Sequence, residues 1–398
     1  MLDQRLKMAR YLTHAMLFLG MALPLSVSAS VVQPTPIKLQ VTVLNKDLQK
    51  PWGLAFLPDG RMLVTEKNGT LKLLSANGQT IAPIQGVPEV NPIGQGGLMD
   101  VALDPAFARN QLIYLTFSES DATDPSRTGT AVFRASLNVN AFKLNGATVI
   151  YRQLPKVQSS GHYGSRLVFD RQAYLFVTLG DRQSRTERVY AQDLARGNGK
   201  VVRITTDGKA APTNPQFAAE GAQAGIWSYG HRNPQGAALH PHTGDLWVSE
   251  HGPQGGDEIN RVLAGKNYGW PVISYGQEYG ISVQVGEGTA KAGMEQPATY
   301  WLTRDGSPYT GWMKSSIAPS GLAFYTGDKF PEYQGNLFSG ALAGTALWRI
   351  VLSPDHQKVL SRERLLADLS ERIRDVRQGP DGYLYLLTDS GKLLKVWR

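Results

Sequence analysis

The sequence predicts an all-β protein, and its repeats favour a six-bladed β-propeller. The 398 residues include 42 glycines and 23 prolines, and 42% of all residues are hydrophobic. This composition supplies a packed core together with many turns, and it is not the composition of a disordered chain. Helical periodicity is nearly absent, whereas a pattern of strand, turn and strand recurs six times along the chain.

Each copy of the pattern has an apolar strand, a turn often built on Asp-Gly or Asp-Pro, and a second apolar strand. The six copies are residues 53–56 with 62–64, 100–103 with 113–115, 166–169 with 174–177, 236–239 with 245–248, 321–324 with 335–338, and 374–376 with 380–385. Alternating apolar and polar side chains are typical of strands, and the turn residues suit short hairpins. A unit repeated at intervals of roughly 45 to 85 residues suggests blades around an axis, since each small sheet needs neighbours on both faces. A sandwich of two sheets is the alternative, because alternation alone does not separate the two folds.

The uneven spacing of the copies indicates long loops inserted after some strands. Such loops commonly carry function. The longest stretch without the pattern is residues 268–319, which is rich in glycine and aromatic residues. We expect this stretch to be an insertion that covers the functional site and not a separate domain.

The first 29 residues have the features of an export signal. Basic residues precede an apolar run at residues 15–27, and small residues follow up to Ala29. The run is shorter than the roughly 20 residues that cross a bilayer as a helix, so a cleaved signal is favoured over a membrane anchor. We therefore expect a signal peptide at residues 1–29 and a catalytic propeller at residues 30–398, in the periplasm or secreted, with no membrane span.

The charge and the cysteine content exclude several classes of site. The chain has no cysteine, which excludes disulfides, thiolate metal sites and a cysteine nucleophile. Its formal net charge is +8, and removal of the signal would subtract three basic residues and one acidic residue to leave +6. No run of lysines and arginines of the kind that binds nucleic acid is present, so an anionic small ligand is the favoured partner.

Polar residues next to glycines follow several strands, where the blades of a propeller would bring their loops to one mouth of the central channel. His162 lies in the segment Gly161-His162-Tyr163-Gly164, just before a strand. An exposed imidazole with a pKa near neutrality suits removal of a proton from a hydroxyl. A surface or capping histidine is the alternative, and for a lone histidine it is the commoner one.

Arg372 and Arg374 are two residues apart, so on a strand their side chains point to the same face. Two adjacent guanidinium groups repel each other unless an anion lies between them, and arginine recognises carboxylates through paired hydrogen bonds. A site for a carboxylate ligand is one interpretation of this pair. A solvated strand edge is the other.

Residues 250–258 and Tyr268 offer oxygen ligands without a thiolate, a combination that suits a hard cation such as calcium. The spacing is not that of an EF-hand. A loop that satisfies its own hydrogen bonds is at least as consistent with these residues. Zinc is disfavoured, because no histidine pair at metal-ligand spacing occurs with supporting carboxylates.

In combination these motifs resemble the soluble aldose sugar dehydrogenases that depend on pyrroloquinoline quinone (PQQ), relatives of soluble quinoprotein glucose dehydrogenase. The matching segments follow one another along almost the entire chain after the proposed signal: residues 51–56, 94–103, 162–169, 226–236, 249–270, 320–325 and 372–388. The resemblance implies a six-bladed propeller with PQQ at the channel mouth and calcium beside it. It also implies oxidation of an aldose at the anomeric hydroxyl to the lactone, with electrons passed on to an external acceptor.

The resemblance further implies roles for single residues. His162 matches the general base that acts on the sugar hydroxyl, Asp181 matches the acid that orients it, and Arg232 matches the arginine that polarises the quinone oxygen. The implied contacts to PQQ are Gln95, His162, Arg232, Asn233, Arg372 and Arg374. A cofactor with three carboxylates would account for the paired arginines.

Calcium ligands are implied in the same way. The carbonyl oxygens of Gly252 and Pro253 match ligands of the calcium beside the cofactor, whose charge would stabilise negative charge that develops on the quinone. Glu258 and Tyr268 match ligands of a second, structural calcium.

One position departs from the family pattern. Where relatives place a lysine against the quinone, this chain has Ala343, so one cation of the cofactor site is missing. Lys314, on the neighbouring insertion, is a candidate to replace it.

Two other functions stay open on the sequence. A calcium-dependent lactonase or esterase could use the same propeller, because a fold does not determine a function. A carbohydrate-binding propeller that has lost its cofactor is the second alternative, and Ala343 is the residue that favours it. A monomer and a dimer are both compatible with the sequence.

Overall fold

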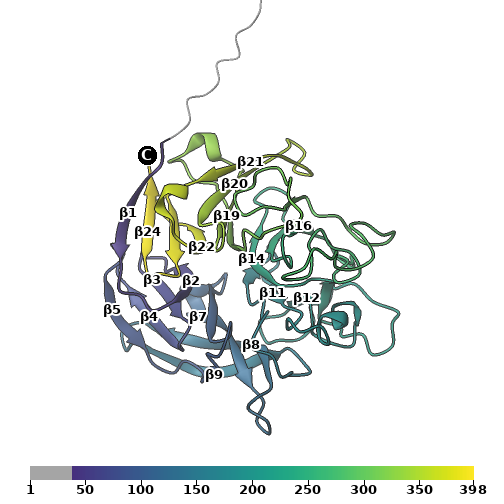
Figure 1. The fold of residues 1–398 in the computed structure, drawn as a ribbon. Helices are drawn as coiled ribbons and strands as arrows, with labels where there is room; N and C mark the ends of the chain where they lie inside the picture. Colours follow the sequence, from purple (N-terminus) through teal and green to yellow (C-terminus); the bar gives the residue numbers. More distant parts are fainter. Residues whose placement is uncertain (1–37) are drawn as a thin grey trace, which may run out of the picture. The chain divides into compact units, whose positions relative to one another are not determined.

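Twenty-four strands form six antiparallel sheets of four strands each, arranged around a common centre in the computed structural model (Figure 1). The structure describes residues 38–398, so the proposed signal peptide lies outside the described residues. The first sheet contains β2 (Pro51–Phe56), β3 (Met62–Glu66), β4 (Thr70–Leu74) and β5 (Thr80–Ile84). The second contains β6 (Leu98–Leu103), β7 (Leu112–Ser120), β8 (Thr128–Asn138) and β9 (Lys143–Arg152). The third contains β10 (Leu167–Phe169), β11 (Leu175–Leu179), β12 (Lys200–Ile204) and β13 (Ile226–Tyr229).

The remaining sheets follow the same order, except that the last one closes the ring. The fourth contains β14 (Pro234–Leu239), β15 (Leu246–Glu250), β16 (Asp257–Val262) and β17 (Thr299–Trp301). The fifth contains β18 (Pro319–Phe324), β19 (Leu337–Ala341), β20 (Ala346–Leu352) and β21 (Val359–Leu365). The sixth contains β22 (Ile373–Gln378), β23 (Leu384–Thr388), β24 (Leu393–Trp397) and β1 (Gln40–Asn45).

The six-bladed propeller predicted from the repeats is confirmed. Each copy of the sequence pattern forms the first two strands of one sheet, and the first strands contact each other in sequence around the centre, from β2 through β22 and back to β2. Helix is almost absent from residues 38–398, which contain only α1 (Phe107–Asn110) and the 3₁₀ turns η1 (Arg188–Gln192), η2 (Pro331–Tyr333) and η3 (Ala367–Leu369).

The ring is closed by pairing between the two ends of the described chain. β1 runs antiparallel to β24, with Gln40 opposite Trp397 and Val43 opposite Leu394. The sixth sheet therefore takes three strands from the end of the chain and one from its beginning. This closure protects an edge that would otherwise expose unpaired backbone groups.

Apolar side chains fill the spaces between neighbouring sheets. One cluster joins the fourth and fifth sheets through Trp247, Ile259, Leu322 and Trp348, all of which are buried. Each such cluster lies between two sheets, so neither sheet can cover its apolar face alone. Burial of this kind stabilises the fold by roughly 25 cal/mol per Å² of apolar surface.

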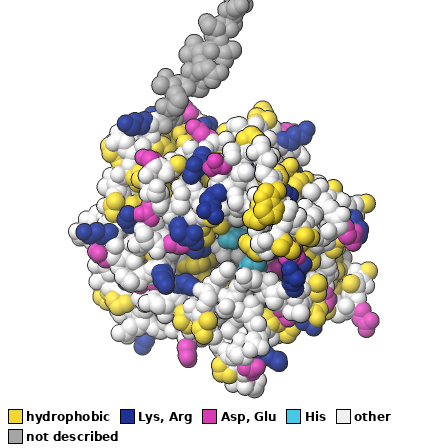
Figure 2. Space-filling model, in the orientation of Figure 1, with side chains coloured by type: hydrophobic (Ala, Val, Ile, Leu, Met, Phe, Trp, Pro, Cys, Tyr) yellow, Lys and Arg dark blue, Asp and Glu magenta, His cyan; other side chains and the backbone are white. Residues whose placement is uncertain are grey.

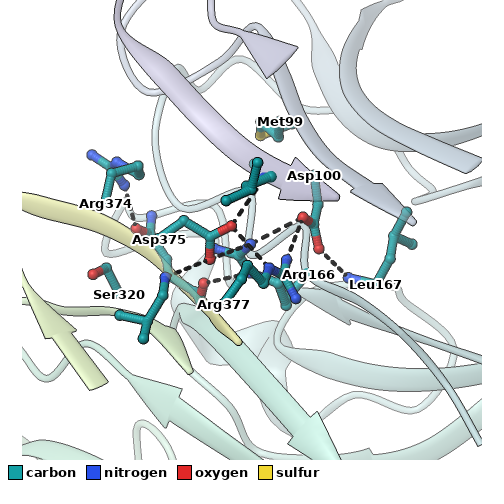
Figure 3. Close-up of polar contacts among 12 residues, drawn as sticks. Met99, Asp100, Arg166, Leu167, Ser320, Arg374, Asp375 and Arg377 are labelled. Atoms are coloured by element: carbon teal, nitrogen blue, oxygen red, sulfur yellow. Dashed lines mark hydrogen bonds and ion pairs between the residues drawn. The ribbon is translucent and has the colours of Figure 1, made fainter. Parts of the chain in front are cut away.

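A buried ion-pair network joins the first strands below the mouth of the channel (Figure 3). Nη1 of Arg166 lies 3.0 Å from a carboxylate oxygen of Asp100 and 3.0 Å from one of Asp375. Arg377 pairs with the same two carboxylates at 2.8 and 3.0 Å. Asp375 also accepts a hydrogen bond from the backbone N–H of Leu54 at 3.1 Å, which fixes β22 against β2.

Residues 268–319 do more than the sequence indicated. They include β17, the fourth strand of its sheet, so part of this stretch belongs to the propeller itself. The rest consists of turns and irregular segments. No helix in residues 38–398 is long and apolar enough to cross a membrane.

Candidate active site

In each sheet, one loop leads into the first strand and another follows the second strand. These loops meet at one end of the propeller. There they surround a cavity of about 270 Å³. Its polar lining comes from the side chains of Lys67, Gln95, Gln235, His251, Arg372 and Arg374. Figure 2 shows histidine side chains in the hollow of this face, with lysine and arginine side chains around it. The volume is near the lower end of the range of roughly 300 to 1,000 Å³ that is usual for small-molecule sites.

Arg372 and Arg374 both line this cavity, and an internal anion lies between them. Nε of Arg372 and Nε of Arg374 donate to the two carboxylate oxygens of Asp389 at 2.9 and 3.0 Å. Arg374 also donates to the side-chain oxygen of Gln235 at 2.9 Å. Asp389 therefore offsets part of the repulsion between the two guanidinium groups, which was expected to need an anionic ligand. Burial raises the pKa of Asp389, but the two arginines hold it below its usual value.

His162 and Asp181 form a buried pair next to the cavity. Nδ1 of His162 lies 2.6 Å from a carboxylate oxygen of Asp181, which also accepts hydrogen bonds from the backbone N–H of Gln183 and from Nε1 of Trp270, each at 2.7 Å. Burial raises the pKa of Asp181, but its interaction with His162, the charge of Arg232 and the hydrogen bond from the N–H of Gln183 together hold it below its usual value. The carboxylate is therefore ionised, and Nδ1 of His162 carries the hydrogen that it accepts. The lone pair of the imidazole is left on Nε2.

The expectation of an exposed histidine is wrong. His162 is only 4% exposed, and burial together with the charge of Arg232 lowers its pKa below 6.5. Neighbouring backbone packs closely against this loop: a Cβ on Gly180 would lie 2.0 Å from the carbonyl oxygen of His162. A neutral imidazole at pH 7 is the state that a general base needs, so burial supports the chemistry that the sequence suggested.

The backbone around this pair is strained. His162, Arg182 and Gln183 have φ values of 46°, 70° and 69°, which are unfavourable for residues with a side chain. Arg182 stabilises the arrangement, because its guanidinium donates to the carbonyl of Gly161 at 2.5 Å and lies 3.6 Å from the ring centre of Tyr163. Strain of this kind commonly concentrates at functional sites.

Arg232 and Asn233 lie immediately before β14 and keep unused hydrogen-bond donors. Arg232 donates through Nη1 to the carbonyl of Gly252 at 2.6 Å, but its buried Nε has no partner among the described residues. Asn233 accepts a hydrogen bond from the N–H of Gly164 at 3.1 Å, while its buried Nδ2 likewise has no partner in residues 38–398. Buried donors without partners are costly, so these atoms indicate a missing ligand.

Gln95 connects the cavity to the histidine. Its side-chain oxygen accepts a hydrogen bond from the backbone N–H of His162 at 2.8 Å, and its side chain also lines the cavity. The predicted residues therefore converge: the base, the acid that orients it and the cavity of the paired arginines are linked by direct contacts.

The four predicted metal ligands surround a second, smaller cavity. Gly252, Pro253, Glu258 and Tyr268 all line it, together with the buried Glu250. Its volume is about 10 Å³, close to that of one water-sized probe. Burial and the charge of Glu250 raise the pKa of Glu258 well above its usual range.

Carboxylates and backbone carbonyls around the smaller cavity offer oxygen ligands that suit calcium, although Arg232 and His251 line the same cavity. No three side chains of histidine, aspartate or glutamate converge on a metal position within the described part of the chain. A calcium ion here would therefore need carbonyl oxygens as well as carboxylates, which is the ligand combination that the sequence suggested. The phenol of Tyr268 is already engaged with the backbone of Arg261 at 2.5 Å and of Leu263 at 2.9 Å, so this residue would have to bind through its carbonyl oxygen.

Lys314 does not replace the missing family lysine at the cavity. Its Nζ donates to the carbonyl of Tyr275 at 2.6 Å, and it is not among the residues that line the larger cavity. Leu342, next to Ala343, lines the cavity without adding charge. Lys314 therefore does not take the place of the family lysine, because its side chain binds the backbone of Tyr275 within the insertion.

Several residues of the site were missed by sequence reasoning. His251 lines both cavities, and its buried Nε2 has no partner in the described structure. Asp389, Trp270 and Lys67 also contribute, as counter-ion, hydrogen-bond donor and cavity wall. His251 could have been identified, because it lies within the glycine-rich segment that was singled out. Trp270 also lies in a segment that matches the family, residues 249–270, whereas Asp389 and Lys67 have no local sequence signal.

Comparisons with known proteins find similar proteins over almost the whole chain. The family described as glucose/sorbosone dehydrogenase matches residues 48–395. Aldose sugar dehydrogenase YliI of Escherichia coli K12 is 46% identical over 377 residues, which cover 94% of this chain and 96% of that protein. The apo-form crystal structure of the soluble aldose sugar dehydrogenase from Escherichia coli superposes with a TM-score of 0.81 at 44% identity, over 90% of this chain and 99% of the other. The PQQ-bound aldose sugar dehydrogenase of Streptomyces coelicolor superposes with a TM-score of 0.72 at 27% identity, over 91% and 99% of the two chains.

Proposed function

Since the chain belongs to the glucose/sorbosone dehydrogenase family and is an enzyme of the PQQ-dependent dehydrogenase type, we propose that it oxidises aldoses at the anomeric hydroxyl to lactones. The observation that carries the proposal is the contact of 2.6 Å between Nδ1 of His162 and the ionised Asp181, which leaves Nε2 of the histidine ready to accept a proton. This base lies beside a cavity that, among residues 38–398, is lined by Lys67, Arg372 and Arg374 and by no carboxylate side chain.

The residues of the larger cavity fit PQQ. Arg372 and Arg374 offer donors to carboxylates, and Gln95 offers an amide group on the same wall. The unpartnered Nε of Arg232 and Nδ2 of Asn233 are further donors for the oxygens of a quinone cofactor. When bound, PQQ supplies the quinone carbon that accepts a hydride from the sugar.

The protein's own part in the reaction is proton transfer and orientation. Nε2 of His162 takes the proton of the anomeric hydroxyl while the carbon loses its hydride, and the sugar leaves as the lactone. Asp181 holds the imidazole in place and stabilises the imidazolium that forms. Arg232, close enough to lower the pKa of His162, stabilises negative charge at the cofactor and favours release of the proton from the base in the next step.

Calcium fits the smaller cavity and would complete the site. We propose that one calcium ion binds here, to the carbonyl oxygens of Gly252, Pro253 and Tyr268 and to Glu258, because a cavity of about 10 Å³ holds only one ion. The two separate ions that the resemblance implies would not fit in it together. A hard cation there would compensate the partly buried carboxylates and strengthen the positive potential around the cofactor.

We further propose that residues 1–29 direct export and are removed, so that residues 30–398 act in the periplasm or outside the cell. An external acceptor would then take the electrons from the reduced cofactor. The export proposal is tested by N-terminal sequencing of the protein recovered from its native compartment.

The activity is tested on purified protein with PQQ, calcium, an aldose and an artificial electron acceptor. We expect reduction of the acceptor that requires both PQQ and calcium, with the lactone as product. Hydrolysis of a lactone without any quinone would identify a calcium-dependent lactonase instead. Sugar binding without turnover, in the presence of both cofactors, would identify a carbohydrate-binding propeller.

A further inference from the structure

Lys67 is a third cation on the wall of the larger cavity. It follows β3 directly, and its side chain lines the cavity together with Arg372 and Arg374. Within residues 38–398 its Nζ forms no ion pair with a carboxylate, and it donates to the carbonyl of Gly94. A charged group of this kind, half-buried and without a counter-ion, is a candidate for binding an anionic ligand.

The backbone holds Lys67 in a fixed position. Its N–H donates to the carbonyl of Lys50 at 3.2 Å, and its carbonyl accepts from the N–H of Leu98 at 3.2 Å. Gly97 packs against the same carbonyl so closely that a Cβ there would lie 2.0 Å from the oxygen. The backbone of Lys67 is therefore held by hydrogen bonds between the first and second sheets, and this fixes the point from which its side chain extends.

The charges of the cavity wall do not balance. Asp389 is the carboxylate that pairs with both arginines, so two of the three cations share one anion and Lys67 has none among the described residues. Burial and the neighbouring charges of Lys50 and Arg374 lower the pKa of Lys67, and the charge of Asp389, with which it forms no ion pair, offsets this only in part. An anionic group in the cavity would stabilise the charged ammonium group of Lys67 and so offset the effect of burial and of the neighbouring cations.

We propose that Lys67 binds a carboxylate of PQQ together with Arg372 and Arg374, and that it supplies at the cavity a cation that Ala343 does not. This inference rests on the proposed function, because it assigns a further residue to the same cofactor. It differs from a purely structural role, in which Lys67 would only hold the loop of Gly94 and Gln95 through its hydrogen bond to the Gly94 carbonyl.

The test is calorimetric titration of the full-length apoprotein with PQQ at constant calcium and at several salt concentrations. Three variants accompany the wild type: Lys67→Met, Lys67→Arg and Lys209→Met. Lys209 is a matched control for net charge, because it is 82% exposed in the turn after β12. Loss of one charge-assisted contact to a carboxylate should raise the Kd of Lys67→Met roughly 10- to 100-fold.

We expect Lys67→Arg to retain most of the affinity and Lys209→Met to bind as the wild type does. The Kd of Lys67→Met should also depend less on salt than that of the wild type, since one ionic contact is gone. A Kd for Lys67→Met within about threefold of the wild type overturns the inference. So does weaker binding with an unchanged salt dependence, which would show that Lys67 only supports the loop. If the wild type itself fails to bind PQQ, the proposed function fails and this inference with it.

Discussion

Replacing Asp181 with asparagine should remove most of the turnover and leave the cofactor in place. Asp181 is completely buried and accepts hydrogen bonds from His162, Gln183 and Trp270, so both of its oxygens act as acceptors. Asparagine has the same shape but offers one acceptor and one donor. In either orientation its amide N–H₂ meets a donor of the protein, and the negative charge that stabilises the imidazolium is lost.

The expected magnitude follows from the role of the pair. Removal of a positioned general base typically costs roughly 10²- to 10⁴-fold in rate, which corresponds to about 3 to 5 kcal/mol in the activation free energy. If the amide turns its N–H₂ towards Nδ1 of His162, the histidine changes tautomer and Nε2 carries the hydrogen. The base is then lost as completely as in His162→Ala. The double variant should therefore be no slower than the slower single variant, because the two residues act as one unit.

The assay measures kcat with saturating PQQ, calcium and aldose, and measures the Kd for PQQ separately by calorimetry. Asp207→Asn is a matched control, because it removes the same charge from an exposed turn of the same sheet. We expect the control to leave kcat unchanged, and His162→Ala and Asp181→Asn to keep the Kd for PQQ near that of the wild type. Retention of more than about a tenth of kcat by Asp181→Asn would refute the reasoning. Parallel loss of PQQ binding and turnover would show that the pair is structural.

Three further predictions follow from the same contacts. The neutral form of His162 is the active one and its pKa is lowered by burial and Arg232, so kcat/KM should fall on acidification with a midpoint below 6.5; a midpoint above 7 would contradict this assignment. Arg166→Met leaves two buried carboxylates with one fewer cation and should lower the free energy of unfolding in urea by about 3 to 5 kcal/mol, whereas Arg127→Met, at an exposed pair, should change it by less than about 1 kcal/mol. Chelation of calcium should lower the melting temperature of the wild type, and Glu258→Gln should reduce that effect; equal shifts in both proteins would exclude Glu258 as a ligand.

The sequence predicted the inner strands of the fold better than the outer ones. β2 and β14 are buried strands joined to their partners by connections of five to six residues, so their apolar runs and turn residues show directly in the sequence. Outer strands such as β5 and β9 are largely exposed and carry mixed side chains, which gives them no clear pattern. Closure of the ring between β1 and β24 depends on pairing across almost the whole described chain, and local sequence does not encode such a register.

The candidate site shows the same division. His162, next to Gly161, was identifiable because close backbone approach favours glycine nearby, whereas Arg232 was singled out by its match to the family pattern. Asp389 was not, because its place between Arg372 and Arg374 comes from the pairing of β22 with β23 and from the turn that follows β23. The burial of His162 was also missed. It depends on residues such as Asp181, which contacts the ring but is distant in the sequence.

The central claim is that the channel mouth gathers positive charge around an anionic quinone beside a histidine base. A crystal structure of the protein soaked with PQQ and calcium tests it most directly. We expect electron density for PQQ in the cavity of about 270 Å³, with its carboxylates in contact with Arg372 and Arg374 and with calcium on the carbonyl oxygens of Gly252 and Pro253. An empty cavity under these conditions, or PQQ bound elsewhere on the protein, would contradict the claim.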